Sequence, residues 1–353
     1  MPAVAIGVGR TSQGITKMTD SVHVIDALDR RVQRRDERRE FFKAALGVGA
    51  LAAGGVATLG FATAANAQTA TPTDADILNF ALQLEYLEAQ FYLYATTGSG
   101  LASGLLTGTG TQGAVITGTG ANAARAVNFG GDTVVQAYAR EIAADEVAHV
   151  TFLRSAGALG SAAVAQPAIN ISGGLDGPFT AAARAAGVIP AGNTTTPFDP
   201  YADANSFLLG AYIFEDVGVT AYKGASPLVR NKTFLQAAAG ILAVEAYHAA
   251  IVRTTLYARG VATPALRTNA DLISNARDTL DGATRDLDQG ISPTTVSGQL
   301  VSNIVPLDAD GLAFSRTPSQ VLNIVYLNAA AATMGGFFPN GLNGTLRASV
   351  TAS

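Results

Sequence analysis

Two of the three histidines in this chain stand three residues after a glutamate, and another glutamate precedes each pair. The order along the chain is therefore Glu, Glu-x-x-His, Glu, Glu-x-x-His. Residues three apart on a helix project from one face, so each pair can present a carboxylate and an imidazole together. This order is typical of a carboxylate-bridged dimetal site inside a four-helix bundle. The six candidate metal ligands are Glu85, Glu146, His149, Glu215, Glu245 and His248.

Coincidence is the alternative explanation for these pairs. A single Glu-x-x-His on a helix is most often a surface pair or a capped histidine in the core. With eight glutamates in the chain, any one histidine has roughly a two per cent chance of following a glutamate at this spacing by accident. Two pairs, each with its own preceding glutamate, therefore favour a site over coincidence.

Each candidate ligand lies within an apolar helical stripe, which predicts that all six face a core. Four carboxylates and two imidazoles cannot stay buried there unpaired, because an unpaired buried charge is costly and like charges repel. Two divalent metal ions carry four positive charges and resolve the conflict. Oxygen and imidazole ligands suit iron or manganese, and zinc is possible.

Three neighbouring residues are expected to surround the ligands. Glu85 and Glu88 can both point inward, and Glu85 is favoured as the ligand because Tyr92 follows it by seven. Glu88 is then a neighbour of the site or a surface group, with ligation as the alternative. Asp145 can reach across and orient His248, or it is solvated. Tyr92 packs in the core, hydrogen-bonds a ligand or carries a radical, and the same choice applies to Tyr138, Tyr212, Tyr222 and Tyr247.

Residues 1–67 have the features of an export leader. The run from Arg38 to Lys43, RREFFK, resembles a twin-arginine motif, and an Ala/Gly-rich apolar run follows it. The small-x-small signal Ala65–Ala67 predicts cleavage before Gln68, hence a periplasmic or secreted protein exported by the twin-arginine route. A retained membrane anchor is the alternative. No later stretch is expected to approach a transmembrane length, so no stable span should remain after cleavage.

The composition of the rest of the chain excludes several classes of site. Residues 68–353 hold 14 Lys and Arg against 21 Asp and Glu, and they form no basic patch, which argues against nucleic-acid binding. The chain has no cysteine, so disulfides, thiolate metal sites and cysteine nucleophiles are excluded. This length is enough for one large domain or for a domain with an appendage.

Four long helices are predicted to carry the candidate ligands. Periodicity and capping residues place them at about 74–95, 132–156, 202–221 and 232–259. The Gly/Thr-rich stretch 98–131 predicts a surface excursion, and 160–201 a long link with a short helix near 178–186. A long link between helices 2 and 3 fits one crossover connection. We therefore expect an all-α protein with a four-helix bundle over 68–261.

The last ninety or so residues, 262–353, are expected to form a helical and irregular appendage packed on the bundle. Helices are predicted near 270–280 and 318–330. The tail at 335–344 is dense in turn residues and contains the adjacent aromatics Phe337 and Phe338.

Three segments resemble the ferritin-like superfamily: 79–92 (NFALQLEYLEAQFY), 141–149 (EIAADEVAH) and the 335–344 tail. More closely, they resemble exported bacterial ferritin-like proteins that are similar to plant desiccation-related proteins. The resemblance implies a ferritin-like bundle with the six candidate ligands as its metal ligands. Superfamily members oxidise ferrous iron, decompose peroxide or activate dioxygen, but fold alone does not fix function.

Two functions are compatible with the sequence. The first is a dimetal oxidoreductase in stress protection, which acts on peroxide or dioxygen or oxidises iron. The second is a non-catalytic stress-protective or structural envelope protein of the desiccation-related type. Expected partners are metal ions, dioxygen or peroxide and, as an option that the sequence leaves open, a homo-oligomer. Whether the chain turns over any substrate is also left open.

Overall fold

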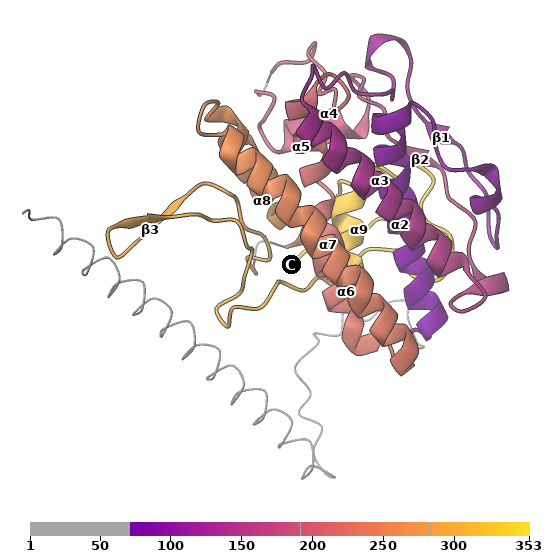
Figure 1. Cartoon of the computed structure of the whole chain (residues 1–353). Coiled ribbons are helices and arrows are strands. Elements are labelled where there is room, and N and C mark those ends of the chain that lie inside the picture. The colour runs from indigo at the N-terminus through magenta and orange to yellow at the C-terminus, as the bar shows by residue number, and fades with distance from the viewer. Residues whose placement is uncertain (1–70, 191, 283) are drawn as a thin grey trace, which may run out of the picture. The chain divides into compact units, whose positions relative to one another are not determined.

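Four helical stretches form a bundle in the computed structural model, which describes residues 71–190, 192–282 and 284–353. Figure 1 shows them running alongside one another. The all-α fold expected from the sequence is confirmed, whereas the expected leader lies outside the described residues. The bundle helices are α2 (Asp74–Thr97), α3 (Thr133–Arg154), the pair α5 (Ala204–Tyr212) and α6 (Glu215–Ala225), and α7 (Lys232–Arg259).

Local sequence signals set the ends of these helices. Thr73 caps α2 through a reciprocal capping box with Asp76, and Gly98 ends the helix with φ of 75°. The Asp132 side chain accepts a hydrogen bond from the Val135 amide at the start of α3. Between its caps, α2 is buried along almost its whole length, so it is the central helix of the bundle.

The third bundle helix is broken, contrary to the continuous helix expected over 202–221. At Ile213 and Phe214 the backbone amides bond three residues back, to Gly210 and Ala211, instead of four. The break separates α5 from α6 immediately before Glu215. No glycine or proline stands at 213 or 214 to announce it, and a side chain from a distant helix contacts the break, as described below.

Two long connections leave the bundle on the way to the third helix. The excursion after α2 contains η1 (Ser103–Leu105), β1 (Val115–Ile116) and η2 (Gly120–Asn122). The crossover from α3 to α5, expected from the sequence, contains η3 (Gly160–Ala162), β2 (Ile169–Asn170) and α4 (Pro178–Ala185). β1 and β2 pair in parallel, with Val115 opposite Ile169, so the two connections hold each other.

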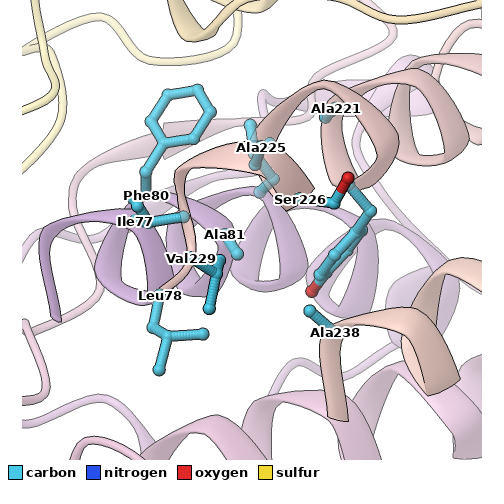
Figure 2. Close-up of a pocket in the computed structure, with 11 residues that line it drawn as sticks. Ile77, Leu78, Phe80, Ala81, Ala221, Ala225, Ser226, Val229 and Ala238 are labelled. Atoms are coloured by element: carbon cyan, nitrogen blue, oxygen red, sulfur yellow. The ribbon is translucent and has the colours of Figure 1, made fainter. Parts of the chain in front are cut away.

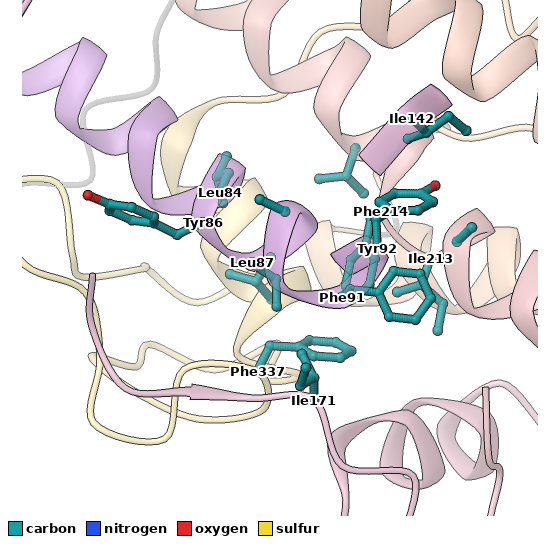
Figure 3. Close-up of a cluster of buried hydrophobic side chains, with 14 of the residues drawn as sticks. Leu84, Tyr86, Leu87, Phe91, Tyr92, Ile142, Ile171, Ile213, Phe214 and Phe337 are labelled. Carbon is teal, nitrogen blue, oxygen red and sulfur yellow. The ribbon is translucent and has the colours of Figure 1, made fainter. Parts of the chain in front are cut away.

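The C-terminal region packs on the bundle through buried aromatic residues. The ring of Phe337 lies 4.9 Å from that of Phe214 and 5.2 Å from that of Phe179, and Figure 3 shows Phe337 and Phe214 among the buried side chains of α2. Burying one such ring stabilises the fold by roughly 1.5–3 kcal/mol. Besides α7, the elements after α6 are η4 (Ser226–Leu228), α8 (Ala265–Asp281), the antiparallel pair β3 (Thr294–Val296) and β4 (Gln299–Val301), and α9 (Pro318–Val325).

Among the described helices, α7 is long and apolar enough to cross a membrane when judged by length and composition. The expectation that no stretch after the leader approaches such a length is therefore wrong for α7. Its buried residues include Glu245, His248 and Arg253. Ionisable side chains are expensive in lipid, and here they lie against other helices of the protein, so α7 serves as a bundle helix.

Candidate metal centre

All six candidate ligands are buried in the centre of the bundle and fall into two overlapping groups. One group is Glu85, Glu146, His149 and Glu245, and the other is Glu215, Glu245 and His248. Within each group the potential ligand atoms lie within 4.8 Å of one another. Glu245 belongs to both groups, so its carboxylate is available to both.

The two histidines present the same ring atom to the carboxylates. His149 Nδ1 lies 3.1 Å from Glu85 Oε2, 3.5 Å from Glu146 Oε2 and 3.7 Å from Glu245 Oε1. His248 Nδ1 lies 3.1 Å from Glu146 Oε1. The ring centroids are 6.2 Å apart. The two imidazoles therefore face the same carboxylate cluster from separate helices.

The other ring nitrogen of His248 faces Asp145, with 3.1 Å between Nε2 and Oδ2. The Asp145 side chain is 43% exposed, whereas the His248 side chain is 2% exposed. A carboxylate at Nε2 favours a proton there and leaves the Nδ1 lone pair free for a metal. Asp145 therefore lies where it can orient the His248 ring, as the sequence predicted.

Two tyrosines bond to the single glutamates in a reciprocal arrangement. The Tyr92 hydroxyl of α2 donates to Glu215 of α6, and the Tyr222 hydroxyl of α6 donates to Glu85 of α2. Each tyrosine follows its own helix's glutamate by seven residues and bonds to the other helix's glutamate. A hydrogen bond to a ligand was one of the roles considered for Tyr92 and Tyr222, and both tyrosines make one.

Several ligand atoms lack a hydrogen-bond partner among the described residues. They are both carboxylate oxygens of Glu146 and of Glu245, Glu215 Oε2 and His248 Nδ1, all buried. Buried polar atoms left unpaired cost roughly 1–3 kcal/mol each, and more when charged. Divalent cations would satisfy these atoms together, so the donor set fits a metal centre built from oxygen and imidazole ligands.

Comparison with known proteins decides the family of this chain. Residues 73–258, more than half of the sequence, match the family described as Ferritin-like domain. The chain is a ferritin-like protein. The match spans all four bundle helices and therefore all six candidate ligands.

Two proteins are similar to this ferritin-like chain over most of its length. It is 30% identical over 282 residues to "Ferritin-like catalase Nec2" of Nesocodon mauritianus, which covers 77% of this chain and 84% of the relative. It is also 30% identical over 281 residues to "Desiccation-related protein PCC13-62" of Craterostigma plantagineum, which covers 77% and 83%. No solved structure matches the chain significantly.

Burial and mutual repulsion shift the acidity of the ferritin-like centre. Burial, with repulsion from neighbouring glutamates, raises the pKa of Glu146 and Glu245 well above the ordinary value. Burial also raises the pKa of Glu215 from 4.5 to about 8. Burial acts on Glu85 in the same sense, but hydrogen bonding and charge attraction from His149 outweigh it and leave its pKa lowered. Without cations the cluster must therefore hold protons at neutral pH.

The two histidines shift in opposite directions. Burial lowers the pKa of His248, and the hydrogen bond to Asp145 only partly opposes this. Burial also acts to lower the pKa of His149, but the hydrogen bond and charge of Glu85 raise it overall. A neutral imidazole is the form that binds metal, so His248 is the histidine that is closer to its ligand form in this ferritin-like protein.

Glu88 is buried, so the surface position considered for it is wrong. Its Oε2 has no hydrogen-bond partner among the described residues. Burial, followed by the charges of Glu215 and Glu85, raises the pKa of Glu88 well above the ordinary value. Glu88 does not belong to either group of converging ligand atoms found among the described residues, so it is a buried neighbour of the candidate ligands.

Two further features shape the ferritin-like centre, and the first, Gly218, was not predicted from the sequence. A Cβ on Gly218 of α6 would lie 2.1 Å from Glu245 Oε2, so only glycine leaves room for that carboxylate. Tyr222 lines a cavity of about 20 Å³ between α2, α6 and α7, whose other walls are almost entirely apolar (Figure 2). One side chain therefore separates this cavity from Glu85.

Proposed function

We propose that this ferritin-like protein binds two divalent metal ions, iron or manganese, and acts as an oxidoreductase on hydrogen peroxide or dioxygen. The observation that carries the proposal is the set of buried carboxylates and imidazoles that converge from four helices, several of whose atoms have no hydrogen-bond partner among the described residues. The name of one relative, a ferritin-like catalase, supports peroxide as the substrate. Zinc fits the same donors, but it has no redox chemistry.

The protein's own residues would hold the metals in a fixed, water-poor site. His149 and His248 would be terminal ligands, and Glu245, which belongs to both groups, would bridge. When bound, the two ions would supply the electron transfers of peroxide disproportionation, in which two peroxide molecules give two waters and one dioxygen. The chain would supply orientation, exclusion of bulk water and proton storage.

The surrounding hydrogen bonds would fix the charge and direction of the ligands. The Tyr92 and Tyr222 hydroxyls donate to Glu215 and Glu85 and hold these carboxylates in place. Asp145 accepts from His248 Nε2. Burial raises the pKa of Glu88 well above its ordinary value, so this carboxyl group would serve as a proton donor close to the reacting region without being a ligand. The cavity beside Tyr222 is large enough for a water-sized molecule such as peroxide.

We further propose that the protein works outside the cytoplasm. The support is the run at Arg38 and Arg39 and the cleavage signal at Ala65–Ala67. A protein without cysteine needs no oxidising compartment to fold. Metal can therefore be loaded in the cytoplasm before a folded protein is exported.

Metal content and peroxide turnover test the proposal together. Protein purified after native expression should contain iron or manganese, and a dioxygen electrode should record dioxygen release after peroxide is added. Wild-type protein reloaded with zinc is the control, because it keeps the fold and ligands but should release no dioxygen. Uptake of much less than one iron or manganese ion per chain would contradict the proposed metal centre. Full loading without any reaction towards peroxide or dioxygen would overturn the activity.

A non-catalytic protective role is the second candidate, because a desiccation-related protein is equally identical to this chain. This role predicts that metal-free and metal-loaded protein protect a drying-sensitive enzyme equally well. Measured recovery of that enzyme after drying and rehydration, with serum albumin as the control, separates the two functions. Equal protection combined with no peroxide turnover would favour the second candidate.

A further inference from the structure

The break between α5 and α6 lies directly before Glu215 and leaves backbone carbonyls for other partners. The Val217 amide bonds to Phe214 O, three residues back, so it does not occupy Ile213 O. Irregular turns inside helices often occur at functional sites. Glu215 is the first residue of α6, so the turn before it sets the direction of the Glu215 side chain.

Arg277 of α8 occupies the broken turn. Its Nη1 donates to Tyr212 O and lies 3.5 Å from Ile213 O. Its Nη2 donates to Asp216 Oδ2 at 2.8 Å. The guanidinium carbon stands 4.7 Å from the centre of the Tyr212 ring. One buried side chain from the C-terminal region thus holds both the end of α5 and the residue after Glu215.

Other charged groups fix Arg277 and Asp216 in turn. Asp288 accepts from Arg277 Nε at 2.8 Å and from Nη2 at 2.7 Å. Arg253 of α7 donates from Nη1 to Asp216 Oδ2 at 2.8 Å, and Arg253 stands five residues after His248. Asp216 therefore connects α6 to both α7 and α8, one residue away from one candidate ligand.

We propose that Arg277 is a positioning residue for the half of the metal centre that contains Glu215. The proposal rests on the metal centre proposed above. A planar guanidinium with five N–H donors can bind a carbonyl and two carboxylates at once, which a lysine ammonium cannot do in the same geometry. Buried ion pairs are weak grounds for stability, because desolvation offsets their attraction. The ion pair of Arg277 with Asp216 is better explained by the position that it gives to α6 than by stability.

The proposal predicts a loss that is selective for one of the two metals. Glu215, the first residue of α6, belongs only to the group with Glu245 and His248. Glu85, Glu146 and His149 of the other group come from α2 and α3, and α6 reaches them through Tyr222, seven residues beyond Glu215. A displaced first turn of α6 should therefore weaken one metal position and leave the other largely intact. A general loss of fold would weaken both.

Arg277→Lys tests the proposal, with Arg316→Lys as the matched control. Arg316 is also fully buried and also bonds to Asp288, at 2.8 Å. Its other side-chain partners are Asp281 at 2.5 Å and Thr220 Oγ1 at 3.0 Å, so it does not touch the broken turn. Cobalt(II) binding to metal-free protein would be titrated against a competing chelator and followed by the visible spectrum of the bound ion. Melting curves of the metal-free variants measure the purely structural effect.

The expected result is one unchanged cobalt affinity and one about 10–100-fold weaker in Arg277→Lys, the range typical of residues that orient metal ligands. In Arg316→Lys both affinities should stay at the wild-type value even where the melting temperature falls. Equal loss at both positions, or the same loss in both variants, would overturn the positioning role. Wild-type protein that binds no cobalt would instead overturn the metal centre itself.

Asp216→Asn replaces Arg277→Lys if that variant does not fold. Asparagine conserves the shape of the side chain and removes the charge that Arg253 and Arg277 share. The same selective weakening of one cobalt position is expected. Wild-type affinity at both positions in folded Asp216→Asn would overturn the proposal.

Discussion

Glu215→Gln should make the metal-free protein more stable while it impairs metal binding. Burial raises the Glu215 pKa from 4.5 to about 8 in the folded protein, so at pH 7 folding requires this carboxyl to take up a proton. Because pH 7 lies 2.5 units above the ordinary pKa, that uptake costs about 3 kcal/mol at roughly 1.4 kcal/mol per unit. Glutamine has the same size, needs no proton and can still accept from Tyr92.

The sign of this effect changes with pH in a defined way. A group whose folded pKa is raised contributes stability below its unfolded pKa and loses that contribution as pH rises through the folded pKa. The stability gain from Glu215→Gln should therefore be near zero at pH 4 and reach about 3 kcal/mol at pH 7. Urea unfolding of chelator-treated protein at both pH values measures this difference.

Metal content provides the second readout, and Glu141→Gln is the control because Glu141 is exposed on α3. Glu215→Gln should lose most of one metal ion per chain, whereas Glu141→Gln should keep both. A metal-free Glu215→Gln protein that is less stable than wild type, with unchanged metal content, would refute the reasoning. Glu215 would then be a buried partner of a cation, yet Lys223, the lysine of the same helix, donates to the Ala313 carbonyl.

Three other predictions follow from the same site and from the leader. Chelator-treated wild-type protein should lose stability from pH 5 to pH 8 in urea unfolding, because burial raises the pKa of Glu146, Glu215 and Glu245; constant stability over this range would contradict their close burial. Asp145→Ala should weaken binding of the metal at His248 about 10–100-fold in a chelator competition, with Glu141→Ala as the control; wild-type affinity would exclude the orienting role. Replacing Arg38 and Arg39 with lysine should leave unprocessed precursor in the cytoplasm, as seen by cell fractionation and immunoblotting; normal processing would indicate the general secretory route.

Spacing along a single helix could be predicted from the sequence because it depends only on local geometry. Glu146 and His149, and likewise Glu245 and His248, needed nothing but an unbroken helix to point the same way. The ends of α7 at Lys232 and Arg259 were also predicted, because Gly260 follows directly. These are properties of neighbouring residues.

The features that the sequence did not reveal depend on distant contacts. Tyr212 stands three residues before Glu215, but its hydroxyl donates to Gln289 O at 3.2 Å instead of to a candidate ligand. Arg277, which contacts the broken turn, is 65 residues away from Tyr212 in the chain. Tyr247 is 72% exposed although it adjoins His248, because consecutive helical residues point about 100° apart.

Because α7 is long and apolar, it matters whether the chain folds before or after it crosses a membrane. In an unfolded chain nothing shields this 28-residue segment, and a translocation channel sorts segments by their free energy of partitioning into lipid. Glu245 and Arg253 oppose partitioning by about 3 kcal/mol each, whereas every leucine, isoleucine and valine favours it by several tenths. A chain that threads through unfolded would risk arrest in the bilayer at α7, but one that folds first has already enclosed its apolar face within the bundle.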